Sequence, residues 1–225
     1  MKRLSLADAG RNEALAQVVS AIQAGGIVLY PTDTVYGLGC DPYSTQALQR
    51  LTKLKQRPLG HAYLVLIGGP GGLSDLVSEI PSSFSFFSQR LWPGPVSMIF
   101  SKEKGKAPFS ENDSIGIRVP HWSFLRDFLE MLRGPLISTS ANRSGEIPTI
   151  DPDEAARQFG MDVDLFLDVG KLPNNRPSTI LDIRSDPPVI LREGAMLRRV
   201  QDAIRDWNES KSSGGDSKKA GGSKS

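Results

Sequence analysis

Apolar residues follow two alternating patterns along the chain, one with helical spacing and one with short strand-like runs. In residues 12–24, Leu15, Val18 and Ile22 fall on one helical face, and Gly25 follows as a helix end. The same spacing predicts helices over 44–55, 81–91, 121–132 and 196–207, and a capped start near 151. Apolar runs predict strands over 27–31, 62–67, 96–100, 114–119, 135–137, 164–169 and 189–192.

This alternation of strands and helices predicts an α/β fold. A chain of 225 residues is long enough to bury a substantial core in one domain. We expect residues 1–208 to form that domain. Residues 209–225 consist mainly of Gly, Ser and Lys, and we expect them to form a disordered tail, because they offer no side chains for a core.

The charge of the tail explains the basic isoelectric point of 8.7. Residues 209–225 carry four lysines and two acids, a net charge of +2, and the whole chain also carries +2. The body therefore sums to zero. Its overall charge gives no indication of nucleic-acid binding, although a local basic face remains compatible with it.

The remaining composition narrows the class of protein. A single cysteine, Cys40, excludes an internal disulfide, and together with only two histidines it argues against a zinc site. No apolar run approaches the roughly 20 residues that span a bilayer, and no apolar signal core follows Met1. We expect a cytoplasmic protein without a membrane partner.

Polar residues at strand ends mark the first candidate site. The run 27–30 stops at Pro31, which cannot continue a hydrogen-bonded ladder, and Thr32, Asp33 and Thr34 follow directly. Open α/β sheets tend to build sites at such strand ends. A polar turn between two core strands explains this stretch alone equally well.

A second candidate lies at the end of the helix predicted over 44–55. Lys55 and Arg57 stand one residue apart before Pro58, and His61 follows. Two adjacent cations can hold a triphosphate. Taken alone, however, the pair is better explained as cations that complement the helix dipole.

Two later segments have the same character. The strand at 135–137 opens into Ser138, Thr139, Ser140 and Asn142, whose hydroxyl and amide groups can bind phosphate or carboxylate oxygens. Residues 176–182 contain another Ser-Thr pair, and the alternation in 114–119 places Arg118 on one face of a strand.

Four segments in this order resemble one family, the YrdC-like threonylcarbamoyl-AMP synthases, over about residues 10–200. They are YPTDTVYGLGCD at 30–41, KQRP at 55–58, WPGPVS at 92–97 with STSANRSG at 138–145, and PSTILD at 177–182 with LREG at 191–194. One such motif is weak, but four in order are specific. The resemblance implies a twisted, mostly mixed sheet with flanking helices and a concave active-site face.

The resemblance also implies a reaction. Members of the family convert L-threonine, bicarbonate or CO2, and ATP with Mg²⁺ into threonylcarbamoyl-AMP and pyrophosphate. The product supplies a threonylcarbamoyltransferase complex that modifies adenosine in tRNA. We expect no zinc and no organic cofactor.

Site residues carry over by position. L-Threonine would be held by Thr32, Ser138 and Ser178. ATP would be held by Lys55, Arg57, His61, Ser97, Ser140, Asn142 and Arg192, with Lys55 and Arg57 as the catalytic pair. Arg118 would complete the positive lining.

Departures from the family pattern leave threonine recognition open. Leu66 and Ser101 stand where some longer members have a histidine and a basic residue, and Pro148 replaces a serine. The chain also resembles the short form without the extra C-terminal domain.

Two alternatives to the synthase remain. The first is a non-catalytic module that binds double-stranded RNA or tRNA through Lys55, Arg57 and Arg118. The neutral body weakens this alternative. The second is carbamoyl transfer, as in the related domain of hydrogenase maturation proteins.

Overall fold

The computed structural model describes residues 1–56, 63–105, 107, 109–110, 113–143, 145–173 and 176–215, with side chains described to residue 212. Its centre is a ten-stranded mixed sheet in the order β1-β8-β2-β3-β7-β4-β6-β5-β9-β10. The strands are β1 Lys2–Ser5, β2 Val28–Pro31, β3 Tyr36–Cys40, β4 Leu64–Leu66, β5 Val96–Ser101, β6 Ser114–Arg118, β7 Leu136–Ser140, β8 Leu165–Asp168, β9 Thr179–Asp182 and β10 Val189–Arg192.

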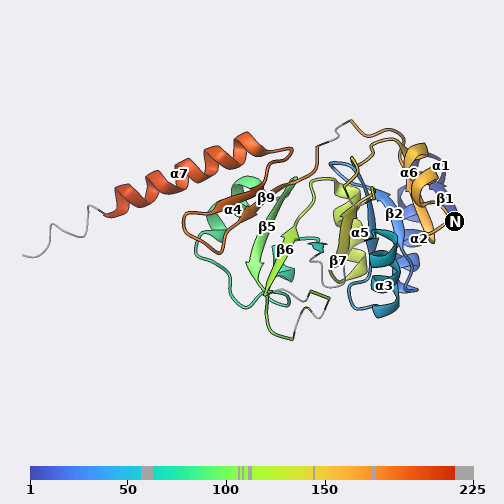
Figure 1. The fold of residues 1–225 in the computed structure, drawn as a ribbon, viewed down its shortest axis with the longest axis horizontal. Coiled ribbons are helices and arrows are strands. Elements are labelled where there is room, and N and C mark those ends of the chain that lie inside the picture. Colours follow the sequence, from blue (N-terminus) through green and yellow to red (C-terminus); the bar gives the residue numbers. More distant parts are fainter. Residues whose placement is uncertain are drawn as a thin grey trace, which may run out of the picture.

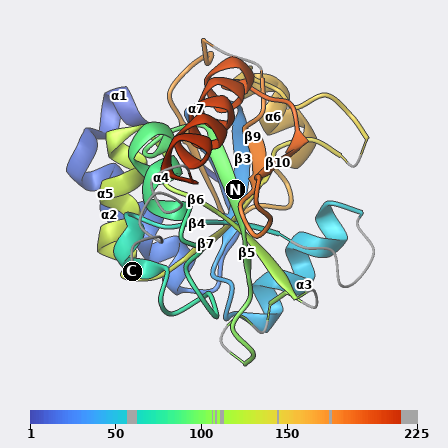
Figure 2. The ribbon, with the colours of Figure 1, turned by 90° about the vertical axis from the view of Figure 1, so that its left-hand side faces the viewer.

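Helices pack on both faces of this sheet. They are α1 Leu6–Ala9, α2 Arg11–Gln23, α3 Thr45–Leu54, α4 Phe84–Leu91, α5 Ser123–Leu132, α6 Pro152–Phe159 and α7 Leu197–Gly215, with a 3₁₀ turn at Pro70–Gly72. Figure 2 shows α2 and α5 together on one side of the strands and α3 and α6 on the other. The predicted α/β fold with a mixed sheet and flanking helices is confirmed.

Two buried clusters hold the helices to the sheet. On one face, Phe124 and Phe128 of α5 and Val18 of α2 pack against residues of β8, β2 and β7. On the other face, apolar residues of α3, α4, α6 and α7 share a larger cluster with the opposite side chains of the strands. Because successive side chains of a strand alternate between faces, β2, β4, β7 and β8 contribute to both clusters.

The last helix is longer than the sequence predicts. It runs to Gly215 instead of ending at Trp207, so residues 209–215 are helical rather than part of a tail. Trp207 packs against Phe86 and donates to Asp186, at 3.0 Å, and Lys211 one turn later also pairs with Asp186. These contacts anchor the added turns along one end of the molecule (Figure 1). Residues 216–225 of the predicted tail lie outside the described residues.

Two strands, β1 and β9, have no apolar pattern strong enough to predict them from the sequence. β1 and β9 were not predicted, although each pairs in parallel with a strand far away in the chain, β8 and β5 respectively. A four-residue strand gains its stability from such partners rather than from its own sequence. Within the described residues, no helix is both long and apolar enough to cross a bilayer.

Candidate active site

A cavity of about 330 Å³ opens over one face of the sheet. Its lining comes from alternate positions on adjacent strands, which the register brings together. Leu64 of β4 lies between Gly116 of β6 and Ser138 of β7, and Gly116 in turn faces Ile99 of β5. The cavity is lined by Thr32, Thr34, Val35, Tyr36, Gly37, Tyr63, Leu64, Ser97, Ile99, Gly116, Arg118, Ser138, Thr139, Ser140, Pro177, Ser178, Ile180, Leu191 and Arg192.

Small side chains create this space. Met98 and Phe100 of β5 point into the core of the opposite face, whereas the alternating residues Ser97 and Ile99 line the cavity. β6 repeats the pattern, with Ile117 in the core and Gly116 in the lining. A Cβ at Gly116 would stand 3.2 Å from both Ile99 and Leu64, so larger residues there would fill the floor.

Of the predicted residues, seven line this one cavity. They are Thr32, Ser97, Arg118, Ser138, Ser140, Ser178 and Arg192. They come from four strands, β5, β6, β7 and β10, and from the segments just after β2 and just before β9, so the fold brings them together. The substrate assigned to each of them stays a prediction.

Thr32 shapes the turn between β2 and β3. Its hydroxyl accepts from the backbone N–H groups of Thr34 and Val35, at 3.1 and 3.2 Å, and donates to the carbonyl of Val35 at 2.7 Å. A Ser or Thr hydroxyl that bonds to backbone two and three residues on is a common turn device. The turn therefore presents the Thr32 hydroxyl at the edge of the cavity with its oxygen already committed to backbone donors.

A hydroxyl pair on β5 and the β9 entry faces Arg192. The oxygens of Ser97 and Ser178 lie 3.0 Å apart and are buried. Arg192 Nη2 donates to the Ser178 hydroxyl at 3.0 Å and to its carbonyl at 2.8 Å. Because the guanidinium carries only donors, Ser178 Oγ accepts, and a proton of the hydroxyl pair stays available for a ligand oxygen.

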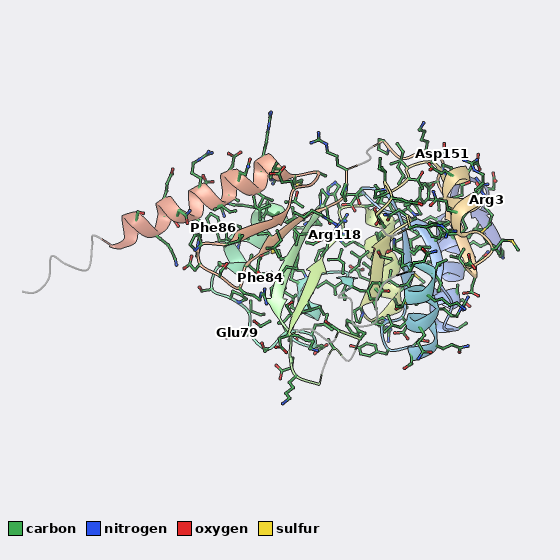
Figure 3. The ribbon with its side chains drawn as sticks, viewed as in Figure 1. Arg3, Glu79, Phe84, Phe86, Arg118 and Asp151 are labelled. Atoms are coloured by element: carbon green, nitrogen blue, oxygen red, sulfur yellow. The ribbon has the colours of Figure 1, made fainter. Side chains whose placement is uncertain are left out.

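Arg118 is the second guanidinium of the cavity, and it is 4% exposed. It pairs with Asp33, and its Nε donates to the carbonyl of Gly94 at 3.1 Å. The other oxygen of Asp33 accepts from the backbone N–H of His121 at 3.1 Å. Figure 3 shows Arg118 near the middle of the molecule, between the α4 end and the end that carries Arg3.

Arg118 stays positively charged at neutral pH. Burial lowers the pKa of its guanidinium to about 10, and the positive charge of Arg192 acts in the same direction. The sequence analysis did not assign Asp33 a role. Its position between Thr32 and Thr34 is the only feature of the sequence that points to a role for Asp33. Its pairing with Arg118 of β6 is seen only in the folded structure.

Lys55 lies behind the cavity rather than in its lining, with no exposed surface. Its ammonium donates to the carbonyl of Ser140, at 2.6 Å, and to the carbonyl and side-chain oxygen of Asn142. The Asn142 amide group donates to the carbonyls of Arg143 and Glu146, at 2.9 and 2.7 Å. Lys55 and Asn142 together hold the loop that follows β7.

Four further residues that the sequence singles out are not among the described residues that line the cavity. Arg57 and His61 lie outside the described residues, so their phosphate contacts stay predictions. Leu66 is buried on β4, next to Arg118 of β6 in the register, and belongs to the core cluster under α5. Ser101 pairs with Ser114 at the far end of β5, away from the cavity.

The arrangement suits an anionic ligand. Two guanidinium groups and several hydroxyls line the cavity together with the apolar side chains of Leu64, Ile99, Ile180 and Leu191. Such a surface neutralises negative charge and covers an apolar group beside it. Within the described residues, no group of three or more His, Cys, Asp or Glu side chains could hold a metal ion.

Comparisons with known proteins identify the family of the chain. A family model for Sua5, YciO and YrdC proteins, described as "Telomere recombination", matches residues 20–194. A protein of Marinobacter nauticus named threonylcarbamoyl-AMP synthase is 31% identical over 172 residues, which cover 75% of this chain and 90% of that protein.

Two solved structures have the same fold. Pyrococcus abyssi Sua5 complexed with L-threonine matches with a TM-score of 0.81 at 26% identity, over 90% of this chain and 59% of that one. Escherichia coli YciO matches with a TM-score of 0.75 at 28% identity, over 86% and 95%. The chain thus spans nearly the whole of YciO and about three-fifths of the P. abyssi protein.

Proposed function

This chain belongs to the Sua5/YciO/YrdC family, and from that premise we propose that it is an L-threonylcarbamoyladenylate synthase. It would make threonylcarbamoyl-AMP and pyrophosphate from L-threonine, bicarbonate or CO2, and ATP. The observation that carries this proposal is the cavity that Arg118, Arg192 and seven Ser or Thr residues line together. All three substrates are anionic or become so during the reaction.

L-Threonine would bind among the hydroxyls of the cavity. Ser138, Ser178 and Thr32 belong to its lining and would hold it. The buried Arg118 guanidinium is placed to hold a carboxylate, because a guanidinium matches carboxylate geometry with two parallel hydrogen bonds. The relative from P. abyssi that was solved with L-threonine supports this choice of ligand.

ATP would bind beside L-threonine in the same cavity. Ser97 and Arg192 would supply donors to it, and Ser140 lies at the start of the loop held by Lys55 and Asn142. We propose that Arg57 and His61, which follow Lys55, reach the phosphates. The apolar residues of the lining would cover uncharged parts of the nucleotide.

In the proposed chemistry, the threonine amine attacks CO2 and loses a proton, which gives a carbamate. A carbamate oxygen then bonds to the α-phosphorus of ATP while the bond to pyrophosphate breaks. Both reacting groups are anions, so the protein acts mainly by neutralising charge and aligning them. Preorganised donors of this kind contribute several kcal/mol to a barrier.

Magnesium would enter as the MgATP substrate, in which it neutralises phosphate charge. The cavity lining contributes hydroxyls and guanidinium groups instead of carboxylates, with Asp33 engaged by Arg118. We propose further that the product passes to a threonylcarbamoyltransferase complex acting on tRNA.

Pyrophosphate release from ATP, with threonine and bicarbonate each supplied or withheld, tests the proposal. We expect release that needs both. Arg118→Gln should lower kcat/KM by about 100-fold, since it removes the buried guanidinium that would align the threonine carboxylate. Arg11→Gln is the matched control, because Arg11 is 43% exposed on α2 and should not change the rate.

Release without threonine, or none from folded protein, would overturn the proposal. Steeply salt-dependent RNA binding without turnover would then favour the RNA-binding alternative. A loss of activity in Arg11→Gln equal to that in Arg118→Gln would show a general effect of lost arginines instead of a role for the cavity.

A further inference from the structure

The side chain of Tyr30 crosses a neighbouring strand to reach the cavity. Tyr30 lies on β2, and Ser138 lies on β7, with β3 between them. Gly39 of β3 pairs with Ser138 in the register. Even so, the Tyr30 hydroxyl stands 2.6 Å from the Ser138 hydroxyl.

The absence of a side chain at Gly39 of β3 makes this crossing possible. A Cβ on Gly39 would stand 2.8 Å from Cε1 of the Tyr30 ring, which is too close for the ring to keep its place. One on Gly37 would stand 3.6 Å from the ring Cζ, in ordinary van der Waals contact. The glycine at position 39 thus has a geometric reason.

The direction of the hydrogen bond follows from the surroundings. The Tyr30 side chain is 2% exposed, and burial raises the pKa of its phenol, so it keeps its proton at neutral pH. The tyrosine donates and the Ser138 oxygen accepts. Within the described residues, the structure shows no acceptor for the Ser138 proton, and Ser138 lines the cavity.

We propose that Tyr30 is a positioning residue that acts through Ser138. It occupies an acceptor site of the Ser138 oxygen, so the serine proton points into the cavity as a donor. The Ser138 hydroxyl would then favour a substrate oxygen beside it and disfavour a hydrogen-bond donor. This inference rests on the proposed function, in which that substrate is L-threonine.

The arrangement differs from a direct contact. Tyr30 does not line the cavity, and its hydroxyl contacts the Ser138 hydroxyl instead of a ligand. Removing the phenol oxygen would leave Ser138 in place but free to rotate its proton toward other acceptors. The effect should therefore appear in threonine binding and disappear when Ser138 is absent.

Steady-state kinetics on Tyr30→Phe, Ser138→Ala and the double variant test this inference. Loss of one oriented hydrogen bond corresponds to about a fivefold change. We expect Tyr30→Phe to raise KM for threonine about fivefold and to leave KM for ATP within about twofold. In the Ser138→Ala background, Tyr30→Phe should add less than about a twofold change.

Calorimetric titration of L-threonine onto the same variants gives a readout without turnover. Tyr43→Phe is the control for removal of a phenol, since Tyr43 is 52% exposed and does not line the cavity. It should titrate like wild type. Thermal unfolding of each variant shows that differences in affinity come from folded protein.

The outcomes separate the two proposals. If wild type turns over threonine but Tyr30→Phe matches it, or if the two substitutions multiply, the role of Tyr30 is wrong and the synthase remains. If wild type neither turns over nor binds threonine, the proposed function fails and the role of Tyr30 fails with it.

Discussion

At the scale of single residues, Lys55 and Arg118 are the two buried cations of the described residues. Arg118 pairs with the carboxylate of Asp33, and the Lys55 ammonium donates to oxygens of Ser140 and Asn142. Lys55 thereby holds the loop after β7. The sequence also predicts Lys55 as one of the catalytic pair.

Replacement of Lys55 tests this double role. Lys55→Met keeps the length of the side chain but leaves the loop oxygens without their donor. We expect a loss of about 1–3 kcal/mol in the free energy of unfolding and a fall in turnover well beyond threefold. Urea unfolding and pyrophosphate release measure the two effects.

Lys53→Met is the matched control, because Lys53 lies on the exposed side of the same helix. It should leave both quantities near wild type. If Lys55→Met kept its rate within about threefold of wild type, the assignment of Lys55 to the site would be wrong.

At the scale of elements, local sequence sets where helices begin more firmly than where they end. Helix α6 starts as the sequence predicts, with Asp151 as its cap and Pro152 in the first turn. The Asp151 carboxylate accepts from the N–H groups of Asp153 and Glu154, at 2.9 and 3.2 Å. Helix α7 in contrast continues beyond Trp207, and Trp207 and Lys211 support it there through Asp186.

The cap gives α6 a pH-dependent stability. Hydrogen bonds from Glu154 and Asp153 lower the pKa of Asp151 in the folded protein. A lowered folded pKa stabilises the protein above the unfolded value of about 4, and this contribution is lost as pH falls through the folded pKa. Asp151→Ala should therefore lower the melting temperature at pH 7 more than at pH 3.

Melting curves of wild type and Asp151→Ala at several pH values provide the measurement. Asp153→Ala serves as a comparison on the same turn, although it also removes the ion pair with Arg3. A melting-temperature difference for Asp151→Ala that stayed constant from pH 7 to pH 3 would contradict the capping role.

At the scale of the whole molecule, the site depends on pairs of strands that are distant in the sequence. β4 lies between β7 and β6, and β5 lies between β6 and β9, so residues from 32 to 192 meet over one face. Every predicted site residue falls within that stretch. The C-terminal basic residues do not belong to it.

Deletion of residues 216–225 should consequently leave turnover within about twofold of wild type, since it removes no site residue. It takes away three of the lysines and one acid, so the net charge of the chain falls from +2 to zero. Binding to RNA through the tail would weaken, with a smaller dependence on salt. Pyrophosphate release and filter binding of tRNA at two salt concentrations compare the two proteins.

A large loss of turnover on this deletion would show that the tail takes part in the reaction. Tail-independent RNA binding with a steep salt dependence would instead locate the RNA on the body, where Arg118 and the predicted cations lie.

The sequence by itself determined the α/β class, the main helices, the cap of α6 and the order of the polar motifs. These features depend on neighbouring residues, such as the spacing of Val18 and Ile22 on α2 or the cap at Asp151. Backbone propensity and burial of one face act over a single element, so a linear pattern is enough to predict them.

Only the tertiary structure decided which motifs meet and what their side chains contact. The pairing of Arg118 with Asp33, the placement of Lys55 behind the cavity and the reach of Tyr30 to Ser138 each join strands or turns separated by about 80 to 110 residues. β1 and β9 likewise form because a distant strand offers hydrogen bonds. Contacts of this range depend on strand order and register, which no short stretch of sequence contains.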